Sequence, residues 1–156
     1  MSRVPLSIAE VEAACDALDA RPDADLAADP AARAAELLAL GEDVIAAWVA
    51  ARGEAPTDAT SEGFRLLALH RQGARGCPSF NACRETCREL VYHHNLVTDD
   101  PLGPDSVQLL RMATMIARHL ALFVGGKLVV EGLGDFCCSS RPIRQGEAAA
   151  RETMES

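Results

Sequence analysis

The chain has 156 residues, of which 49% are hydrophobic and 24% charged, and this is enough for one globular domain with a buried core. Its net charge of −8 argues against a nucleic-acid-binding surface, which normally needs a basic patch. The N-terminal stretch lacks the apolar core of a signal peptide, and the most apolar segment carries Arg118 and His119 and is too short to span a bilayer. We therefore expect a cytoplasmic protein that binds neither nucleic acid nor membrane.

Capping signals and helical periodicity predict two helices in the first third of the chain. Ser7 and Glu10 have the spacing of a capping box, which begins a helix over about 8–20. The polar, proline-containing stretch 21–30 is typical of a linker. Its last residues, Asp29-Pro30, then begin a second helix over about 30–51, because aspartate caps a helix and proline suits its first position.

Three further helices are expected between residues 64 and 124. The first ends near Gly73 or Gly76, and the second runs over about 79–97 with Ser79 or Asn81 as its cap. The third, over about 106–124, is the most apolar, and we expect Gly125-Gly126 to stop it.

The chain changes character after this helix. The segment KLVVEGLGDFCCSS, residues 127–140, combines β-branched residues with glycines and predicts a short hairpin. We therefore expect an all-α fold: a single-domain bundle of about five helices with a short C-terminal β-like hairpin, over residues 1–140. Residues 141–156 form a polar C-terminal tail in this scheme.

The cysteines carry the chemical information. Cys77, Cys83 and Cys87 lie within eleven residues, and Cys137 and Cys138 form an adjacent pair much later. At 100° per residue, Cys83 and Cys87 share one face of the expected helix and should point inward. Cys77 precedes the helix, where main-chain N–H groups and the positive end of the helix dipole would stabilise a thiolate. In a reducing compartment such a group favours metal binding or redox chemistry over a disulfide framework.

Three clustered cysteines with one remote cysteine are typical of an iron–sulfur cluster, which needs four soft ligands. We expect Cys77, Cys83 and Cys87 to be three of them, with Cys138 or Cys137 as the fourth. The predicted function is then electron transfer, cluster delivery or redox sensing. Zinc is the alternative metal, although structural zinc sites more often use C-x2–4-C pairs.

Two alternatives stay open beside the iron–sulfur hypothesis. In one, the same thiolates bind zinc and the protein is a structural adaptor. In the other, the cysteines are core residues of a metal-free helical interaction module, whose apolar helix 106–124 contacts a protein partner or forms a homodimer. For the iron–sulfur hypothesis, an acidic surface suits docking with a basic partner protein.

Enzymatic catalysis is not favoured by the sequence. It contains no G-x-S-x-G, no phosphate-binding G-x-x-x-x-G-K-[ST] and no C-x-x-C. Cys15, in the middle of the first helix, is expected to be a core residue, and His70 and His119 are isolated and expected to be structural.

Overall fold

A computed structural model describes residues 4–133. Within this range the chain is all-α and contains no β-strand, which confirms the predicted class. Its helices are α1 (Ile8–Ala20), α2 (Asp23–Ala28), α3 (Pro30–Ala51), α4 (Arg65–Ala74), the 3₁₀ helix η1 (Pro78–Cys83), α5 (Arg84–Asp99) and α6 (Ser106–Glu131). The chain divides into two units, Met1–Gly126 and Lys127–Ser156, which are described separately.

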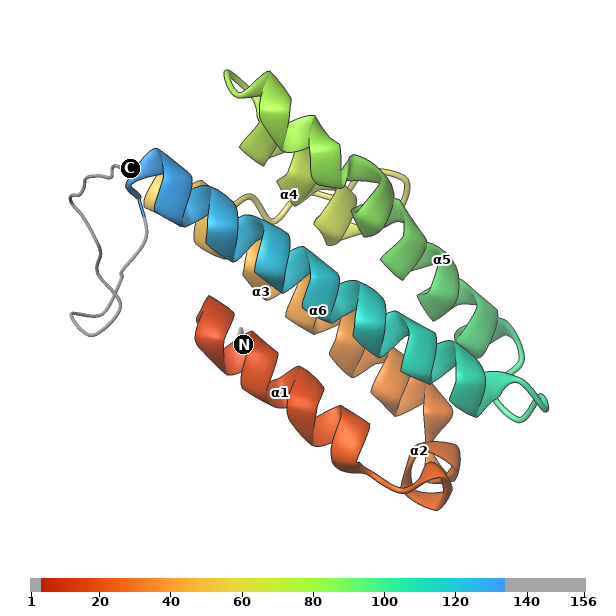
Figure 1. Ribbon diagram of the computed structural model, residues 1–156. Helices are drawn as coiled ribbons and strands as arrows, with labels where there is room; N and C mark the ends of the chain where they lie inside the picture. The colour runs from red at the N-terminus through yellow and green to blue at the C-terminus, as the bar shows by residue number, and fades with distance from the viewer. Residues whose placement is uncertain (1–3, 134–156) are drawn as a thin grey trace. The chain divides into compact units, whose positions relative to one another are not determined.

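Helix α3 is the central helix of the first unit. It packs against α1, α2, α4 and α5, and Figure 1 shows it in orange between the red α1 and the green α5. Its inward side chains are fully or almost fully buried, among them Leu37, Val44, Ile45 and Trp48. The core is therefore mainly aliphatic, as the low aromatic content of the sequence implies.

Two arginines of α6 join that helix to α1. Arg118 pairs with Asp16 at 2.8 Å and with Asp19 at 2.7 Å. Arg111 pairs with Asp23 at 2.7 Å and donates to three main-chain oxygens at the end of α1, those of Leu18, Asp19 and Arg21. These carbonyls lie at a helix end, where the i+4 amide partners of the helix are missing, so Arg111 acts as a cap supplied from another helix.

The first two helix starts are as predicted. The Ser7 hydroxyl accepts from the Glu10 amide at 3.1 Å and the Glu10 carboxylate accepts from the Ser7 amide at 2.9 Å, which confirms the capping box. The Asp29 carboxylate caps α3. The expected linker between them instead contains α2, because Leu26 is buried there at 2% exposure and a helical turn satisfies the main chain around it.

The predicted end of α6 at Gly125-Gly126 is wrong, since the helix continues to Glu131. Glycine permits a left-handed residue but does not compel one, and both glycines stay inside the helix. The turn comes at Gly132, whose φ is 69°. There the Leu133 amide donates to the Leu128 carbonyl at 2.9 Å and the Gly132 amide to the Val129 carbonyl at 3.1 Å, the two bonds of a Schellman motif.

The predicted hairpin is therefore wrong over residues 127–131, which are helical, and the rest of that segment from residue 134 lies outside the described residues. The expected division into a domain over 1–140 and a tail over 141–156 falls partly on the same undescribed part and stays a prediction. By length and composition alone α6 could cross a membrane, a property that core helices of soluble proteins share.

Candidate functional site: a buried thiol pair beside His70

The end of α4 and the loop that follows it are held from α3. The Trp48 indole N–H donates to the Gly73 carbonyl at 2.9 Å, and Arg52 donates to the carbonyls of Gly73 and Arg75, both at 3.0 Å. A Cβ on Gly73 would lie 2.8 Å from Trp48 Cδ1, so only glycine allows this approach. The cysteine segment that follows this loop therefore begins at a fixed place against α3.

The cysteine segment is two helices instead of the single one expected over 79–97. Residues 78–83 form the 3₁₀ helix η1, with Pro78 at its first position, and α5 begins at Arg84. The expected cap at Ser79 or Asn81 is therefore wrong, and Cys83 itself is the residue that precedes α5. The tighter 3₁₀ turn rotates the following side chains relative to an α-helix.

Phe80 is the anchor of η1. Its ring is fully buried and stacks on Trp48, with centroids 4.7 Å apart, and on His70, with centroids 5.3 Å apart. Its carbonyl oxygen lies 3.1 Å from His70 Nε2 and 3.3 Å from Cys83 Sγ. One buried carbonyl thus brings a histidine of α4 and a cysteine of η1 together.

Cys83 and Cys87 are in contact in the core. Their exposed fractions are 2% and 0%, which confirms the expectation that both point inward, and their sulfur atoms hydrogen-bond to each other. His70, itself 3% exposed, lies close to Cys83, since its ring nitrogen and the Cys83 sulfur both contact the Phe80 carbonyl oxygen.

This environment separates the two thiols in acidity. The hydrogen bond from Cys87 lowers the pKa of Cys83 from 9.0 to about 6, against the opposing effect of burial and with further support from His70. The same bond, together with burial, raises the pKa of Cys87 well above 9.0. The Phe80 carbonyl oxygen, which also contacts His70, accepts from the Cys83 thiol at 3.3 Å, and this hydrogen bond favours the protonated form of Cys83. Of the two thiols, Cys83 is therefore the one that ionises more readily.

Of the other predicted ligands, only Cys77 lies within the described residues. Cys77 is partly exposed, and its sulfur lies 3.5 Å from the Ser79 hydroxyl. Cys137 and Cys138 lie outside the described residues. Residues 4–133 contain no group of three or more His, Cys, Asp or Glu side chains arranged to hold a metal ion. The four-cysteine ligand set stays a prediction.

His70 is a site residue that the sequence does not single out, because an isolated histidine is expected to be structural. It lies thirteen residues before Cys83, a spacing with no helical meaning. The available signal was its place on α4, since Leu66, Leu69 and Gly73 are buried at helical spacing around it. A histidine on the apolar face of a short helix needs a polar partner in the core.

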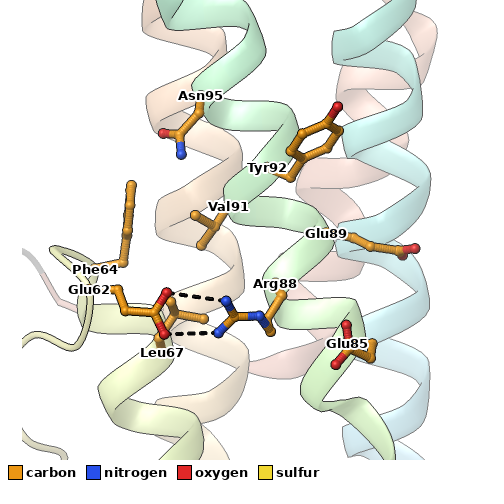
Figure 2. Close-up of a pocket in the computed structure, with 9 residues that line it drawn as sticks. All are labelled: Glu62, Phe64, Leu67, Glu85, Arg88, Glu89, Val91, Tyr92 and Asn95. Carbon is orange, nitrogen blue, oxygen red and sulfur yellow. Dashed lines mark hydrogen bonds and ion pairs between the residues drawn. The ribbon is translucent and has the colours of Figure 1, made fainter.

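Two cavities share Glu62, Leu67 and Arg88 in their walls. The smaller, of about 190 Å³, is lined by His70, whose ring contacts the same Phe80 carbonyl oxygen as the Cys83 sulfur. The larger, of about 430 Å³, is drawn in Figure 2, where dashed lines mark the ion pair between Glu62 and Arg88. That pair is bidentate, with both N–O distances 3.1 Å, and it lowers the pKa of Glu62.

Glu62 is held in position by a strained turn. Ser61 and Phe64 exchange main-chain hydrogen bonds of 3.0 Å, and Glu62 and Gly63 between them have φ of 55° and 85°. Positive φ at both central residues defines a type I′ turn, and it costs a non-glycine residue about 1 kcal/mol or more. The turn presents the Glu62 carboxylate to Arg88 at the rim of both cavities.

Cys15 is separate from this site. It is fully buried in α1, as expected of a core residue, and burial raises its pKa to about 11. Comparison with protein-family models, curated proteins and solved structures finds no match to this chain. The chemistry of the thiol pair must therefore be argued from its own surroundings.

Proposed function

We propose that Cys83 and Cys87 form a redox-active dithiol, so that the protein transfers or senses reducing equivalents through a reversible disulfide. The observation that carries the proposal is the pair of buried thiols beside His70, in which the pKa of Cys83 is lowered and that of Cys87 is raised. Dithiol exchange needs this asymmetry, because a thiolate must attack while its partner keeps a proton until the second step.

A small disulfide RSSR oxidises the thiol pair in two steps. The Cys83 thiolate attacks one sulfur of RSSR, forming a mixed disulfide and releasing one thiolate RS⁻. Cys87 then gives its proton to solvent or to the leaving group and attacks Cys83 Sγ, which releases the second RS group as RSH. The protein is oxidised by two electrons and RSSR is reduced to two thiols.

Oxidation has to change the first turn of α5. Residues four apart on a helix have Cβ atoms about 5–6 Å apart, whereas a disulfide needs about 3.5–4.5 Å. Cys83 lies where η1 changes into α5, a junction between two helix types that can rearrange without disturbing the rest of α5. Since both thiols are buried, the same opening would admit the oxidant.

The test is to equilibrate the protein in glutathione redox buffers, block free thiols and digest with trypsin. Cleavage after Arg84 separates Cys83 from Cys87, so a disulfide links the peptides 76–84 and 85–88. Cys77 shares the first peptide, and Cys77→Ser is therefore the matched control that should keep the link, while Cys83→Ser should lose it. If Cys83 and Cys87 stay reduced in every buffer while the chain stays folded, the proposal is wrong.

A second candidate is the cysteine-ligated metal centre, most simply an iron–sulfur cluster and otherwise zinc. It is favoured by the three cysteines within eleven residues and by the low pKa of Cys83, because metals bind thiolates. Anaerobically purified protein should then contain iron or zinc. Cys83→Ser should remove most of it, and Cys15→Ser should leave it unchanged. Metal-free wild-type protein would eliminate this candidate, and failure of both tests would favour the metal-free interaction module.

A further inference from the structure

The smaller cavity beside His70 is positively charged in a chain of net charge −8. Its walls contain three arginines, Arg71 from α4 and Arg84 and Arg88 from α5, and one carboxylate, that of Glu62. The local field is thus opposite in sign to that of the whole molecule, and a concave wall concentrates such a field.

Arg71 and Arg84 have N–H groups available for a ligand. Arg88 donates two N–H groups to Glu62, whereas Arg71 donates one, to the Ser61 hydroxyl at 3.3 Å. Arg84 makes one long ion pair, 3.5 Å, with its exposed neighbour Glu85. A guanidinium has five N–H donors in a planar fork, so Arg71 and Arg84 can each bind a carboxylate as well.

The cavity adjoins the thiol pair through one residue. His70 lines the cavity, and its Nε2 lies 3.1 Å from the Phe80 carbonyl oxygen, which the Cys83 sulfur contacts at 3.3 Å, so a molecule held there lies near Cys83. A volume of about 190 Å³ is below the range of cavities that enclose drug-sized ligands, which begins at about 300 Å³. It suits a short carboxylate-bearing fragment and not a nucleotide.

We propose that this cavity binds the anionic end of a small carboxylate-bearing disulfide and so selects such disulfides as the oxidants of Cys83. The inference rests on the proposed dithiol function and names its substrate class. Arg71 and Arg84 bind the carboxylate, and the disulfide bond then lies toward His70 and Cys83. Glu62 limits the affinity, because it neutralises Arg88 and repels the incoming anion.

The test uses three disulfides of one shape and different charge: bis(2-carboxyethyl), bis(2-hydroxyethyl) and bis(2-aminoethyl) disulfide. The measured quantity is the second-order rate constant for forming the Cys83–Cys87 disulfide in the reduced protein at low ionic strength. We expect the dianion to react about tenfold or more faster than the neutral compound and the dication to react slowest, with the differences shrinking at 0.5 M salt.

Variants identify the residues that distinguish the anionic disulfide from the neutral one. Arg71→Gln and, as a second variant, Arg84→Gln should each lower the ratio of the anionic to the neutral rate constant about threefold or more, and Glu62→Gln should raise it. Arg75→Gln is the matched control, since Arg75 lies on the same segment but lines a different cavity and should leave the ratio unchanged. Far-UV circular dichroism of each variant verifies folding.

The outcomes separate the two proposals. The proposal that the cavity binds the anion would be wrong if all three disulfides had equal rate constants. It would also be wrong if Arg71→Gln and Arg84→Gln left the ratio of the anionic to the neutral rate constant unchanged. In both cases the dithiol function would stand. If none of the three disulfides oxidises the folded protein at any concentration, the dithiol function falls, and the substrate inference falls with it.

Discussion

The sulfur of Cys83 has three polar neighbours in an otherwise apolar core: the Cys87 thiol, the His70 ring and the Phe80 carbonyl. A buried charge is unfavourable unless hydrogen bonds compensate it, so these neighbours decide whether Cys83 ionises. Cys15 is equally buried and lacks such donors, and its pKa moves in the opposite direction. The contrast shows that burial alone does not make these thiols acidic.

A first prediction concerns the titration of this thiol. The absorbance of the thiolate at 240 nm should rise with a midpoint near pH 6 in the wild type. Cys87→Ala removes the hydrogen bond that lowers the pKa of Cys83 most, so the midpoint should move up toward 9.0. Cys15→Ala should leave it unchanged. A wild-type midpoint at or above 8.5 would contradict the proposed role of Cys83 as the attacking thiolate.

At the scale of single elements, two glycines have very different roles in their helices. Gly73, in the last turn of α4, lies against the stacked rings of Trp48 and Phe80. Gly126, within α6, has nothing within 4 Å of the position that a Cβ would occupy. The same residue type therefore serves packing in one helix and only lowers helix propensity in the other.

This difference predicts opposite effects of one substitution. Gly73→Ala would place a Cβ 2.8 Å from Trp48 Cδ1 and 3.0 Å from Phe80 Cε2, and the rigid rings must shift. We expect a loss of about 1–3 kcal/mol in the free energy of unfolding. Gly126→Ala should increase that free energy by up to about 1 kcal/mol, because alanine is the better helix former. Urea denaturation of both variants checks the signs, and a neutral Gly73→Ala would show that the loop is not packed as described.

The end of α6 also depends on the conformation of its glycines. Gly125-Gly126 and Gly132 look alike as stop signals, yet only Gly132 adopts a positive φ. The i, i+4 pair of Lys127 and Glu131, 3.3 Å apart, supports the turns that follow the first two glycines. Helix α6 therefore continues past Gly125-Gly126 and ends at Glu131.

At the scale of the molecule, the acidity of Cys83 links stability to pH. Below pH 6 the thiol is protonated in both the folded and the unfolded chain. Between pH 6 and pH 9 the folded chain carries the thiolate while the unfolded chain still binds that proton, so the free energy of unfolding gains with rising pH. Above pH 9 the raised pKa values of Cys87 and Cys15 have the reverse effect.

A third prediction follows for unfolding measurements. The difference in free energy of unfolding between the wild type and Cys83→Ala should become more favourable to the wild type from pH 6 to pH 9. The chain has one tryptophan, Trp48, which is fully buried and stacked on Phe80, so its fluorescence reports unfolding of the first unit directly. A difference that stays constant over this range would mean that Cys83 does not ionise in the folded protein.

The sequence by itself determined the all-α class, the starts of α1 and α3, and the inward orientation of Cys83 and Cys87. These features depend on local causes: the capping box at Ser7, the Asp29-Pro30 pair, and a four-residue spacing that places two side chains on one face. Local causes can be read from neighbours along the chain, which is why these predictions held.

Only the tertiary structure decided the rest. Helix α2 exists because Leu26 finds a place in the core, and the 3₁₀ start of the cysteine segment goes with the stacking of Phe80 between Trp48 and His70. His70 joins Cys83 from another helix, across thirteen residues and a loop that α3 holds in place. Such contacts depend on which surfaces meet after folding, and no spacing within one segment encodes them.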